Sequence, residues 1–417
     1  MDYDLIISGA GPAGLCLARA LSGHGLRLAV VEQQPLAALE DPAFDGREIA
    51  LTQHSAQLMR TLGLWERIEP HALSPLRDAR VMNGPSPFAM VIDHALGKRS
   101  ELGWLVSNHL IRRAAFECVQ QSRQEHADIT LMASESVSGV RTDAEAAHVT
   151  LASGVLLKAR MLVAADSRFS TTRRAMGIAA DLHDFGRSML VCCMTHDEPH
   201  HHAAWEWFGY GQTLALLPMN DDPATGEHRS SVVLTLPSQD IDPLVSLEPT
   251  AFNQEMARRF DQRLGRMTLA STRHAYPLVA VYARHFSGHR CALLGDAAVG
   301  MHPVTAHGYN LGLSGVERLT RALVEARRTG RDIGDAAVLA AYARDHHRHA
   351  WPIYQGTNTV VRLFTDARPL PRLLRQAVLQ GARRLPPLKA AIVAQLTGRT
   401  PGQPAWRPVL PMQPPAP

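Results

Sequence analysis

The hydrophobic positions near the start of the chain form two short apolar runs with a helical pattern between them. The first run, in residues 2–8, leads directly into glycines, and the second, residues 26–31, ends at Glu32. Residues 15–22 carry the spacing of a helix that packs on a sheet, and Gly23 and Gly25 then break it. This order predicts a strand, a helix and a second, parallel strand.

The loop after the first strand predicts a dinucleotide site. Glycines at this place let the backbone approach a pyrophosphate, and an acid about 20 residues later can bind a ribose. We therefore expect Glu32 to bind the ribose, and the pyrophosphate to be bound by Gly9, Gly11, Pro12, Ala13 and Gly14.

A second ligand loop is predicted nearly three hundred residues later. The apolar residues 291–294 form a short buried strand that stops at Gly295 and Asp296. A loop containing Pro303 and Gly308 then begins the long helix 308–328. The carboxylate can accept hydrogen bonds from cofactor hydroxyls, and the helix terminus offers free N–H groups.

A third polar position follows another buried strand, residues 158–165, which ends at Asp166. Ligands of open α/β sheets collect at the carboxyl ends of such strands. Arg47, which precedes a predicted helix at 55–62, can place a fixed positive charge beside the pyrophosphate. The alternative for Arg47 is an ordinary surface arginine.

The rest of the pattern predicts an inserted, mainly antiparallel sheet and a helical end. Residues 129–132, 137–141 and 149–151 suggest an antiparallel ribbon, and residues 106–119 an amphipathic helix. From 185 to about 283 the apolar period is two, with one helix at 249–264 and candidate strands at 188–195, 204–208, 213–218 and 230–236. Residues 336–396 are predicted to be helical.

The expected fold class is therefore α/β, with a Rossmann-like nucleotide-binding domain and an inserted β-sheet substrate domain. The nucleotide-binding domain is expected at 1–72, 106–184 and 285–345. The substrate domain is expected at 73–105 and 185–284, a helical region at 346–400 and a disordered tail at 401–417.

Composition excludes several classes of protein. The chain has 417 residues, 46% hydrophobic and 20% charged, as in ordinary globular proteins. A net charge of +4 is too small to argue for nucleic acid. No apolar run reaches the roughly 18–20 residues of a membrane span, and no signal-peptide pattern opens the chain, so we expect a cytoplasmic protein. The five cysteines lie mostly in apolar runs and are expected to be buried thiols.

The three motifs in this order resemble those of the group A flavoprotein aromatic hydroxylases, which use FAD. The resemblance covers nearly the whole chain. Within that superfamily the chain is similar to the ubiquinone-biosynthesis hydroxylases, in the segments GREIALTQHS (46–55), LGLW (62–65), the flavin loop (302–313) and RLPPLK (384–389). The variants ADSRFS (165–170) and VTAHG (304–308) most resemble a bacterial branch acting on demethoxyubiquinol-type intermediates.

The resemblance implies a role for each motif residue. Arg47 and Arg112 would contact the phosphate and ribityl region of FAD, and Asp166 would support the pyrophosphate. Asp296 would hold the ribityl chain, Pro303 and Gly308 would border the isoalloxazine, and the cofactor would also be bound by Gly295, Tyr309 and Asn310. NAD(P)H would reduce FAD, and O₂ would form a C4a-hydroperoxide that hydroxylates the ring of a polyprenylated precursor.

Two positions depart from the family pattern. Asp166 is followed by Ser167 instead of glycine, and His307 stands where the family has glutamine. We assign His307 and Pro303 to the catalytic site. His307 could titrate near neutrality or simply replace the amide as a neutral hydrogen-bonding group. No catalytic base for the phenol is evident.

Several alternatives stay open. The substrate could be a soluble aromatic metabolite, the activity could be reduction of prenyl double bonds, or the chain could be an inert FAD-bound assembly subunit. The basic C-terminal helices could attach to a membrane or pack on the FAD domain. The histidines at 200–202 and 346–349 suggest metal sites or, alternatively, a solvated turn and a polar helix face. Trp205, Trp207 and Phe208 could be sheet core or could line a ring pocket.

Overall fold

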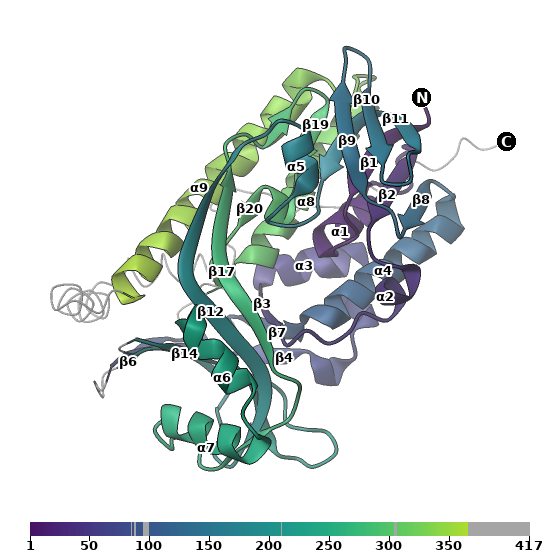
Figure 1. Ribbon diagram of the computed structural model, residues 1–417. Helices are drawn as coiled ribbons and strands as arrows, with labels where there is room; N and C mark the ends of the chain where they lie inside the picture. The colour runs from purple at the N-terminus through teal and green to yellow at the C-terminus, as the bar shows by residue number, and fades with distance from the viewer. Residues whose placement is uncertain (85, 87–88, 95–99, 210, 304–306, 366–417) are drawn as a thin grey trace.

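A computed structural model describes residues 1–84, 86, 89–94, 100–209, 211–303 and 307–365. Two large β-sheets lie at opposite ends of the molecule, with a small third sheet between them (Figure 1). The predicted tail at 401–417 and the RLPPLK segment lie outside the described residues.

The first sheet contains the strands that precede the three motifs. Among the described residues it has eight strands, in the order β18–β19–β11–β1–β2–β8, with β10 and β9 joined beyond β11. The central neighbours β19, β11, β1, β2 and β8 are parallel. The bounds are β1 Tyr3–Ser8, β2 Leu28–Glu32, β8 Ile129–Ala133, β9 Val137–Thr142, β10 Ala147–Leu151, β11 Leu156–Ala164, β18 Ser287–Gly288 and β19 Cys291–Leu293.

Alternate residues of the strands point to opposite faces of this sheet. Each face packs in its own hydrophobic core. Leu5 and Ile7 of β1 pack in one core with α1, α4 and α8, whereas Ile6 packs in another core that includes α9. The helices are α1 Pro12–Leu21, α2 Leu36–Glu40, α3 Gln53–Leu62, α4 Asn108–His126, α5 Thr171–Ala175, α8 Gly308–Arg328 and α9 Ala336–Thr365.

The second sheet is mainly antiparallel and is built around a 17-residue strand, β12. Its order is β20–β17–β12–β15–β14–β13–β5–β6, with β16 also on β12. The bounds are β5 Asp78–Asn83, β6 Ala89–Ile92, β12 Ala180–His196, β13 Ala203–Phe208, β14 Thr213–Pro218, β15 His228–Pro237, β16 Met267–Leu269, β17 His274–Ala283 and β20 Val299–Gly300. Strands β12 and β17 run together from the first sheet to the far end of the molecule (Figure 1).

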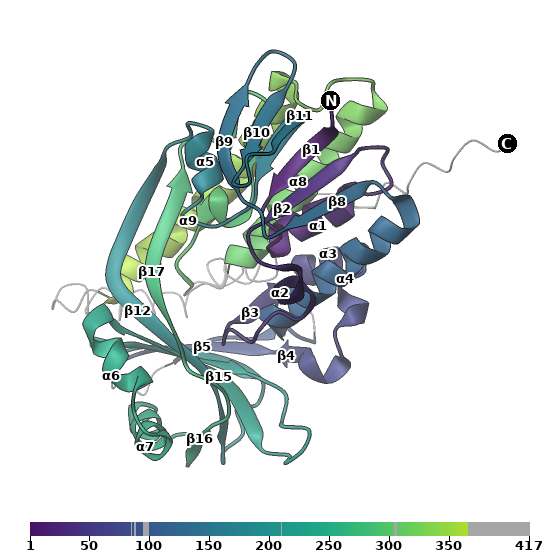
Figure 2. The same ribbon diagram turned by 45° about the vertical axis from the view of Figure 1, so that its right-hand side comes forward.

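The two faces of the second sheet meet different partners. Leu190, Cys192 and Met194 of β12 pack against α6 (Ile241–Val245) and α7 (Pro249–Arg259). Cys193 points the other way and packs against Leu105. That residue belongs to the third sheet, which consists of β3 Glu48–Thr52, β7 Gly103–Ser107 and β4 Ser74–Leu76. In Figure 2, β3 and β4 lie between the helices of the first sheet and strands β5 and β15 of the second.

Two secondary-structure predictions were wrong, and one expected domain boundary falls inside a strand. Residues 129–132 form β8, which pairs in parallel with β2 and is not part of the antiparallel ribbon of β9 and β10. The interval between β15 and β17 contains α6 as well as α7, and α7 ends at Arg259. Strand β17 was not predicted by itself, although it pairs antiparallel with β12 on the side opposite β15. The boundary expected at 184/185 falls inside β12, so that strand is common to both predicted domains.

The described helices include none with the length and apolar character needed to cross a membrane.

Candidate functional site

The first glycine loop is held against the end of β11 by very close backbone packing. Gly9 has φ +107°, and a Cβ built on it would lie 2.7 Å from the carbonyl oxygen of Ala165 and 2.8 Å from Cα of Asp166. A Cβ on Gly14 would lie 2.0 Å from the carbonyl oxygen of Gly9. Glycine is therefore required at both positions by the protein itself.

Gly11 differs, because a Cβ there would meet no heavy atom of the described chain within 4 Å. It precedes Pro12, the first residue of α1, and no side chain caps that helix. A helix N-terminus of this kind presents N–H groups and positive potential to an anion. The open side of Gly11 and the helix terminus together fit a pyrophosphate.

The carboxylate of Glu32 is oriented by two backbone amides. Ala10 N–H donates to Oε2 at 2.7 Å, and Gln34 N–H donates to Oε1 at 2.9 Å. These bonds join the glycine loop to the end of β2. Each carboxylate oxygen can accept a further hydrogen bond, as a ribose diol requires. Arg112 of α4 donates to the side-chain oxygen of Gln34 at 2.9 Å, which places its guanidinium beside the same strand end.

Asp166 follows β11 directly beside Gly9. Its Oδ2 accepts a long hydrogen bond from Thr172 N–H at 3.4 Å. Its Oδ1 is buried and has no hydrogen-bond partner among the described residues. A buried carboxylate oxygen is costly without a partner, so this atom fits a polar ligand group.

The third motif lies against the first. Gly295 has φ +60°, and a Cβ on it would lie 3.1 Å from that of Ala13. Asp296 accepts an ion-paired hydrogen bond from Arg168 at 3.0 Å, and Arg168 also donates to the carbonyl oxygen of Val279 at 3.0 Å. Sequence reasoning missed Arg168, although it stands only two residues after Asp166.

Arg47 is held by a carboxylate that the sequence analysis did not single out. Asp45 accepts hydrogen bonds from Nη2 of Arg47 at 2.6 Å and from the amide of Asn108 at 2.8 Å. The hydroxyl of Tyr276, on β17, donates to the Asp45 carbonyl oxygen at 2.8 Å. Arg47 therefore stands at the junction of the third sheet with the second.

Two predicted cofactor residues have structural side-chain partners. The Tyr309 hydroxyl lies 3.9 Å from Sγ of Cys16 in the first core, and burial raises the pKa of that hydroxyl well above its ordinary value. Asn310 accepts a hydrogen bond from Thr52 N–H at 3.0 Å and donates to the Ala50 carbonyl oxygen at 2.8 Å. The amide of Asn310 thus joins α8 to β3, beside the loop of Arg47.

Among the described residues, the N-terminus of α8 is as open as that of α1. A Cβ on Gly308 would meet no heavy atom of the described chain within 4 Å, and the buried His307 precedes it as N-cap. His302, beside Pro303, makes an edge contact with Phe185 of β12 at 4.9 Å between ring centroids. Burial, with help from the nearby Arg187 and Arg168, lowers the pKa of His302 to about 4, so the ring is neutral at pH 7.

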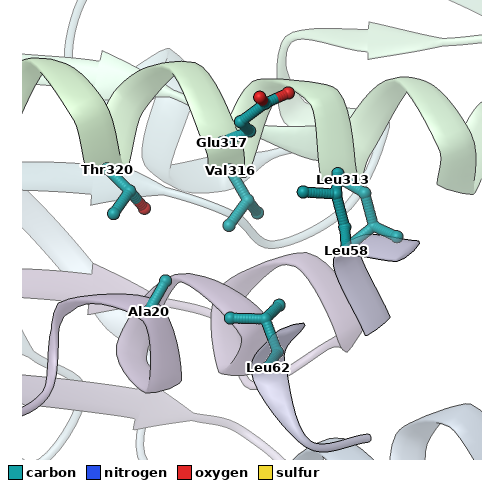
Figure 3. Close-up of a pocket in the computed structure, with 7 residues that line it drawn as sticks. All are labelled: Ala20, Leu58, Leu62, Leu313, Val316, Glu317 and Thr320. Atoms are coloured by element: carbon teal, nitrogen blue, oxygen red, sulfur yellow. The ribbon is translucent and has the colours of Figure 1, made fainter. Parts of the chain in front are cut away.

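Figure 3 shows a small cavity between α1, α3 and α8 that is separate from these motifs. Its lining consists of Ala20, Leu58, Leu62, Leu313, Val316, Glu317 and Thr320. The one acid there, Glu317, is already paired with His54 at 3.0 Å and with Arg321 at 3.0 Å. The cavity is a gap in helix packing and not part of the cofactor site.

Each histidine group has one buried member, whereas His201 is exposed in the expected turn and His347 is exposed on α9. His200 is buried, not solvated, and bonds to the Met219 carbonyl oxygen through Nε2 at 2.9 Å and to His202 N–H through Nδ1. His346 is buried under α8 and stacks on Tyr342, so it is not on a polar helix face. Trp205 packs in the core with α7, whereas Phe208 meets Phe364 of α9 on the other face of the sheet.

The five cysteines are all buried free thiols, as expected.

The comparisons with known proteins agree with this geometry. The family model described as FAD binding domain matches residues 2–357, which defines the class as an FAD-binding flavoprotein. Ubiquinone hydroxylase UbiM of Neisseria meningitidis is 44% identical over 95% of this chain and 85% of its own. Ubiquinone hydroxylase UbiL of Rhodospirillum rubrum is 32% identical over 95% of this chain and 89% of its own.

The chain therefore belongs to the group A flavoprotein hydroxylases, in the branch that contains the ubiquinone hydroxylases, and it is an FAD-dependent monooxygenase. The fold is also that of a solved structure, p-nitrophenol 4-monooxygenase PnpA from Pseudomonas putida. The two superpose with a TM-score of 0.74 at 18% identity, covering 95% of this chain and 98% of the other.

Proposed function

We propose that this enzyme hydroxylates the aromatic ring of a polyprenylated ubiquinone precursor of the demethoxyubiquinol type, with NAD(P)H as electron donor and O₂ as oxidant. The observation that carries the proposal is the 44% identity to a ubiquinone hydroxylase along 95% of the chain. It is supported by the 27% identity, over 93% of this chain and 96% of its own, to the 3-demethoxyubiquinol 3-hydroxylase of Escherichia coli.

Each polar group near the three motifs has a proposed task. Gly9, Gly11 and Gly14, with Pro12 and Ala13, bind the pyrophosphate at the start of α1. Asp166 supports that group through its unpaired Oδ1. Glu32 and Arg112 bind the adenosine side, where the carboxylate is already oriented by two backbone amides.

The flavin end is proposed to lie between α8 and the second sheet. Asp296 and Gly295 bind the ribityl chain, and Pro303, His307 and Gly308 border the ring system, with the backbone at Tyr309 and Asn310 behind them. Arg47, fixed by Asp45, adds a positive charge on the opposite side. Bound FAD supplies the oxygen-transfer chemistry.

The protein supplies orientation and excludes water, because water in the site diverts the oxidant to hydrogen peroxide. The second sheet is placed for this task, since Val191 of β12 and His274 of β17 pack against the loop of Arg47. We propose accordingly that the chain is divided into a nucleotide-binding domain (1–72, 106–184, 285–345) and a substrate domain (73–105, 185–284), which share strand β12 across the 184/185 boundary.

We also propose that the basic C-terminal region (346–400), which begins within α9, gives the enzyme peripheral contact with an anionic membrane, from which a prenylated substrate can be taken. Flotation of the full chain with anionic and with neutral vesicles tests this. Binding to anionic vesicles that is lost when the chain ends at Thr365 supports it. Equal flotation of both chains contradicts it.

The substrate class is tested by quinone profiling of a strain from which the gene is deleted. We expect a precursor lacking one ring hydroxyl to accumulate, and the wild-type gene to restore the normal quinone. A gene encoding Asp166→Ala is the matched control and should not restore it. An unchanged quinone profile, together with accumulation of a soluble phenol, contradicts the proposal.

A further inference from the structure

The face of the second sheet that points away from α6 and α7 carries one carboxyl group in an apolar setting. Strand register aligns a row across the sheet that consists of Val81, Glu206, Ala215, Val233, Val191 and His274. Glu206 is the one acid of this row, and its two direct neighbours are Val81 and Ala215.

The side of the sheet that Glu206 faces follows from its neighbours in β13. Trp205 packs in the core with α7, and Trp207 donates from Nε1 to the Gly84 carbonyl oxygen at 2.8 Å. Since adjacent strand residues point to opposite faces, Glu206 points the other way, as does Phe208, which meets Phe364. This is the face directed to the third sheet and the cofactor motifs.

That face is partly accessible to solvent around Glu206. Its residues next to Glu206 are only half-buried, namely Val81, Ala204, Ala215 and Val233, whereas the residues under α6 and α7 are buried. Two of the four are alanines, which leave space in front of the carboxyl. The part of this face around Glu206 is therefore a largely apolar floor, and the row's other ionisable group, His274, stands at its far end under the loop of Arg47.

The same row leads to the proposed flavin end. A Cβ on Gly46 would lie 2.8 Å from Cγ2 of Val191 and 2.9 Å from Cδ2 of His274, so the loop of Arg47 rests on the row. Glu206 is three strands from Val191. At about 4.8 Å per strand, this separation is roughly 14 Å. An aromatic ring can lie on the floor between that loop and the carboxyl.

We propose that Glu206 is the catalytic base that accepts the proton of the substrate's ring hydroxyl. This inference rests on the proposed function, because it requires a phenol or quinol substrate. The O–H bond of the substrate breaks, its electron pair stays on the ring oxygen, and a new O–H bond forms on the carboxylate. The step transfers only a proton, and it makes the ring a stronger electron donor toward oxygen.

The environment of Glu206 suits this task. Its carboxyl makes no hydrogen bond or ion pair with the described residues, and its cross-strand neighbours carry no charge. Burial alone raises its pKa to about 8. A phenolic hydroxyl has a pKa of about 10, so the mismatch falls from roughly 6 units for an exposed glutamate to roughly 2.

The test compares the purified holoenzyme with Glu206→Gln and Glu206→Asp across pH 6–10, with a demethoxyquinol substrate bearing a short prenyl chain. In the wild type we expect kcat/KM to rise through an inflection near pH 8. In Glu206→Gln the inflection should vanish and kcat should fall by about 10²–10⁴-fold. Glu206→Asp should keep the inflection at a lower rate. Glu255→Gln, on α7 behind the sheet, is the matched control and should behave as wild type.

A second measurement separates a base from a positioning group. Fluorinated ring substrates, whose hydroxyls are more acidic, should recover much of the lost kcat in Glu206→Gln and little in the wild type. Glu206→Gln with wild-type kcat, or with a lower kcat and a retained inflection, overturns the inference. If instead the wild type yields no hydroxylated product from this substrate, the proposed function fails and not the role of Glu206.

Discussion

Gly11 and Gly14 stand in the same turn, yet the structure predicts opposite consequences for the same substitution at each. Gly14→Ala would place a Cβ 2.0 Å from the carbonyl oxygen of Gly9, where real contacts essentially never fall below 3.0 Å. Helix α1 must then move by about 1 Å from the end of β1, at a cost of roughly 1–3 kcal/mol in the free energy of unfolding. The apoprotein should therefore unfold at a lower temperature.

Gly11→Ala meets no atom of the described protein within 4 Å, and the backbone there (φ −70°, ψ 175°) is open to any residue. The apoprotein should keep its stability or gain about 0.4–1 kcal/mol, because the unfolded chain loses freedom. The added methyl occupies the approach to the pyrophosphate, so the Kd for FAD should rise at least about tenfold, or ~1.4 kcal/mol.

The assay is thermal unfolding of each apoprotein, followed by titration with FAD and measurement of fluorescence quenching. The two variants should separate cleanly, with Gly14→Ala unstable before any cofactor is added and Gly11→Ala impaired only in binding. Wild-type FAD affinity in Gly11→Ala would refute the placement of the pyrophosphate at the start of α1.

Three further predictions follow from individual contacts. Glu32→Ala removes the acceptor of two backbone N–H groups, so it should cost about 1–3 kcal/mol of unfolding free energy and weaken FAD binding. Glu32→Gln should lose less stability. Equal urea midpoints for the two variants would contradict this. Burial lowers the pKa of His200 to about 4, below the roughly 6.5 of the unfolded chain. The neutral ring therefore contributes on the order of 3 kcal/mol of stability above pH 6.5, and this contribution is lost as the pH falls toward 4. Urea unfolding at pH 7.5 and 5 should therefore show a smaller pH effect in His200→Gln, and an unchanged effect would rule this source out. His307→Gln should leave turnover and its pH profile unchanged if His307 is a neutral replacement for the amide, and a displaced profile would show that it titrates in catalysis.

The nucleotide-binding fold could be predicted because its signals are local. The glycines at 9, 11 and 14 stand within one short turn, and β1, α1 and β2 follow in order, although the close contact that requires Gly9 comes from the distant end of β11. The long helix α8 was predicted with its observed bounds, since its apolar stripe is continuous and Gly308 opens it.

What could not be predicted depends on partners distant in sequence. The apolar run of β8 would suit pairing with either β2 or β9, so it does not identify its partner strand. In the structure β8 pairs in parallel with Leu28–Glu32 of β2. His346 sits in an Arg-rich sequence, but Gly315 of α8 leaves a place for its ring, because a Cβ there would lie 3.1 Å from Nε2. Arg168 and Asp296 are separated by 128 residues.

Glu206 shows the same limit at the candidate site. Glu206 stands between two tryptophans, and this alternation in the sequence predicts a solvent-facing residue of an amphipathic strand. The sheet's second face, however, is directed into the molecule, so the alternation places the carboxyl among Val81, Ala215 and Val233. A burial that raises its pKa could be read only from the structure.

The central claim, that this flavoprotein inserts oxygen into the ring of a prenylated quinol, is tested most directly with ¹⁸O₂. The purified FAD-bound enzyme is supplied with NADH or NADPH and a demethoxyquinol, and the product is analysed by mass spectrometry. We expect one ¹⁸O atom per product molecule and consumption of NAD(P)H in step with product. Oxidation of NAD(P)H to form hydrogen peroxide alone, with no labelled quinol, would contradict it.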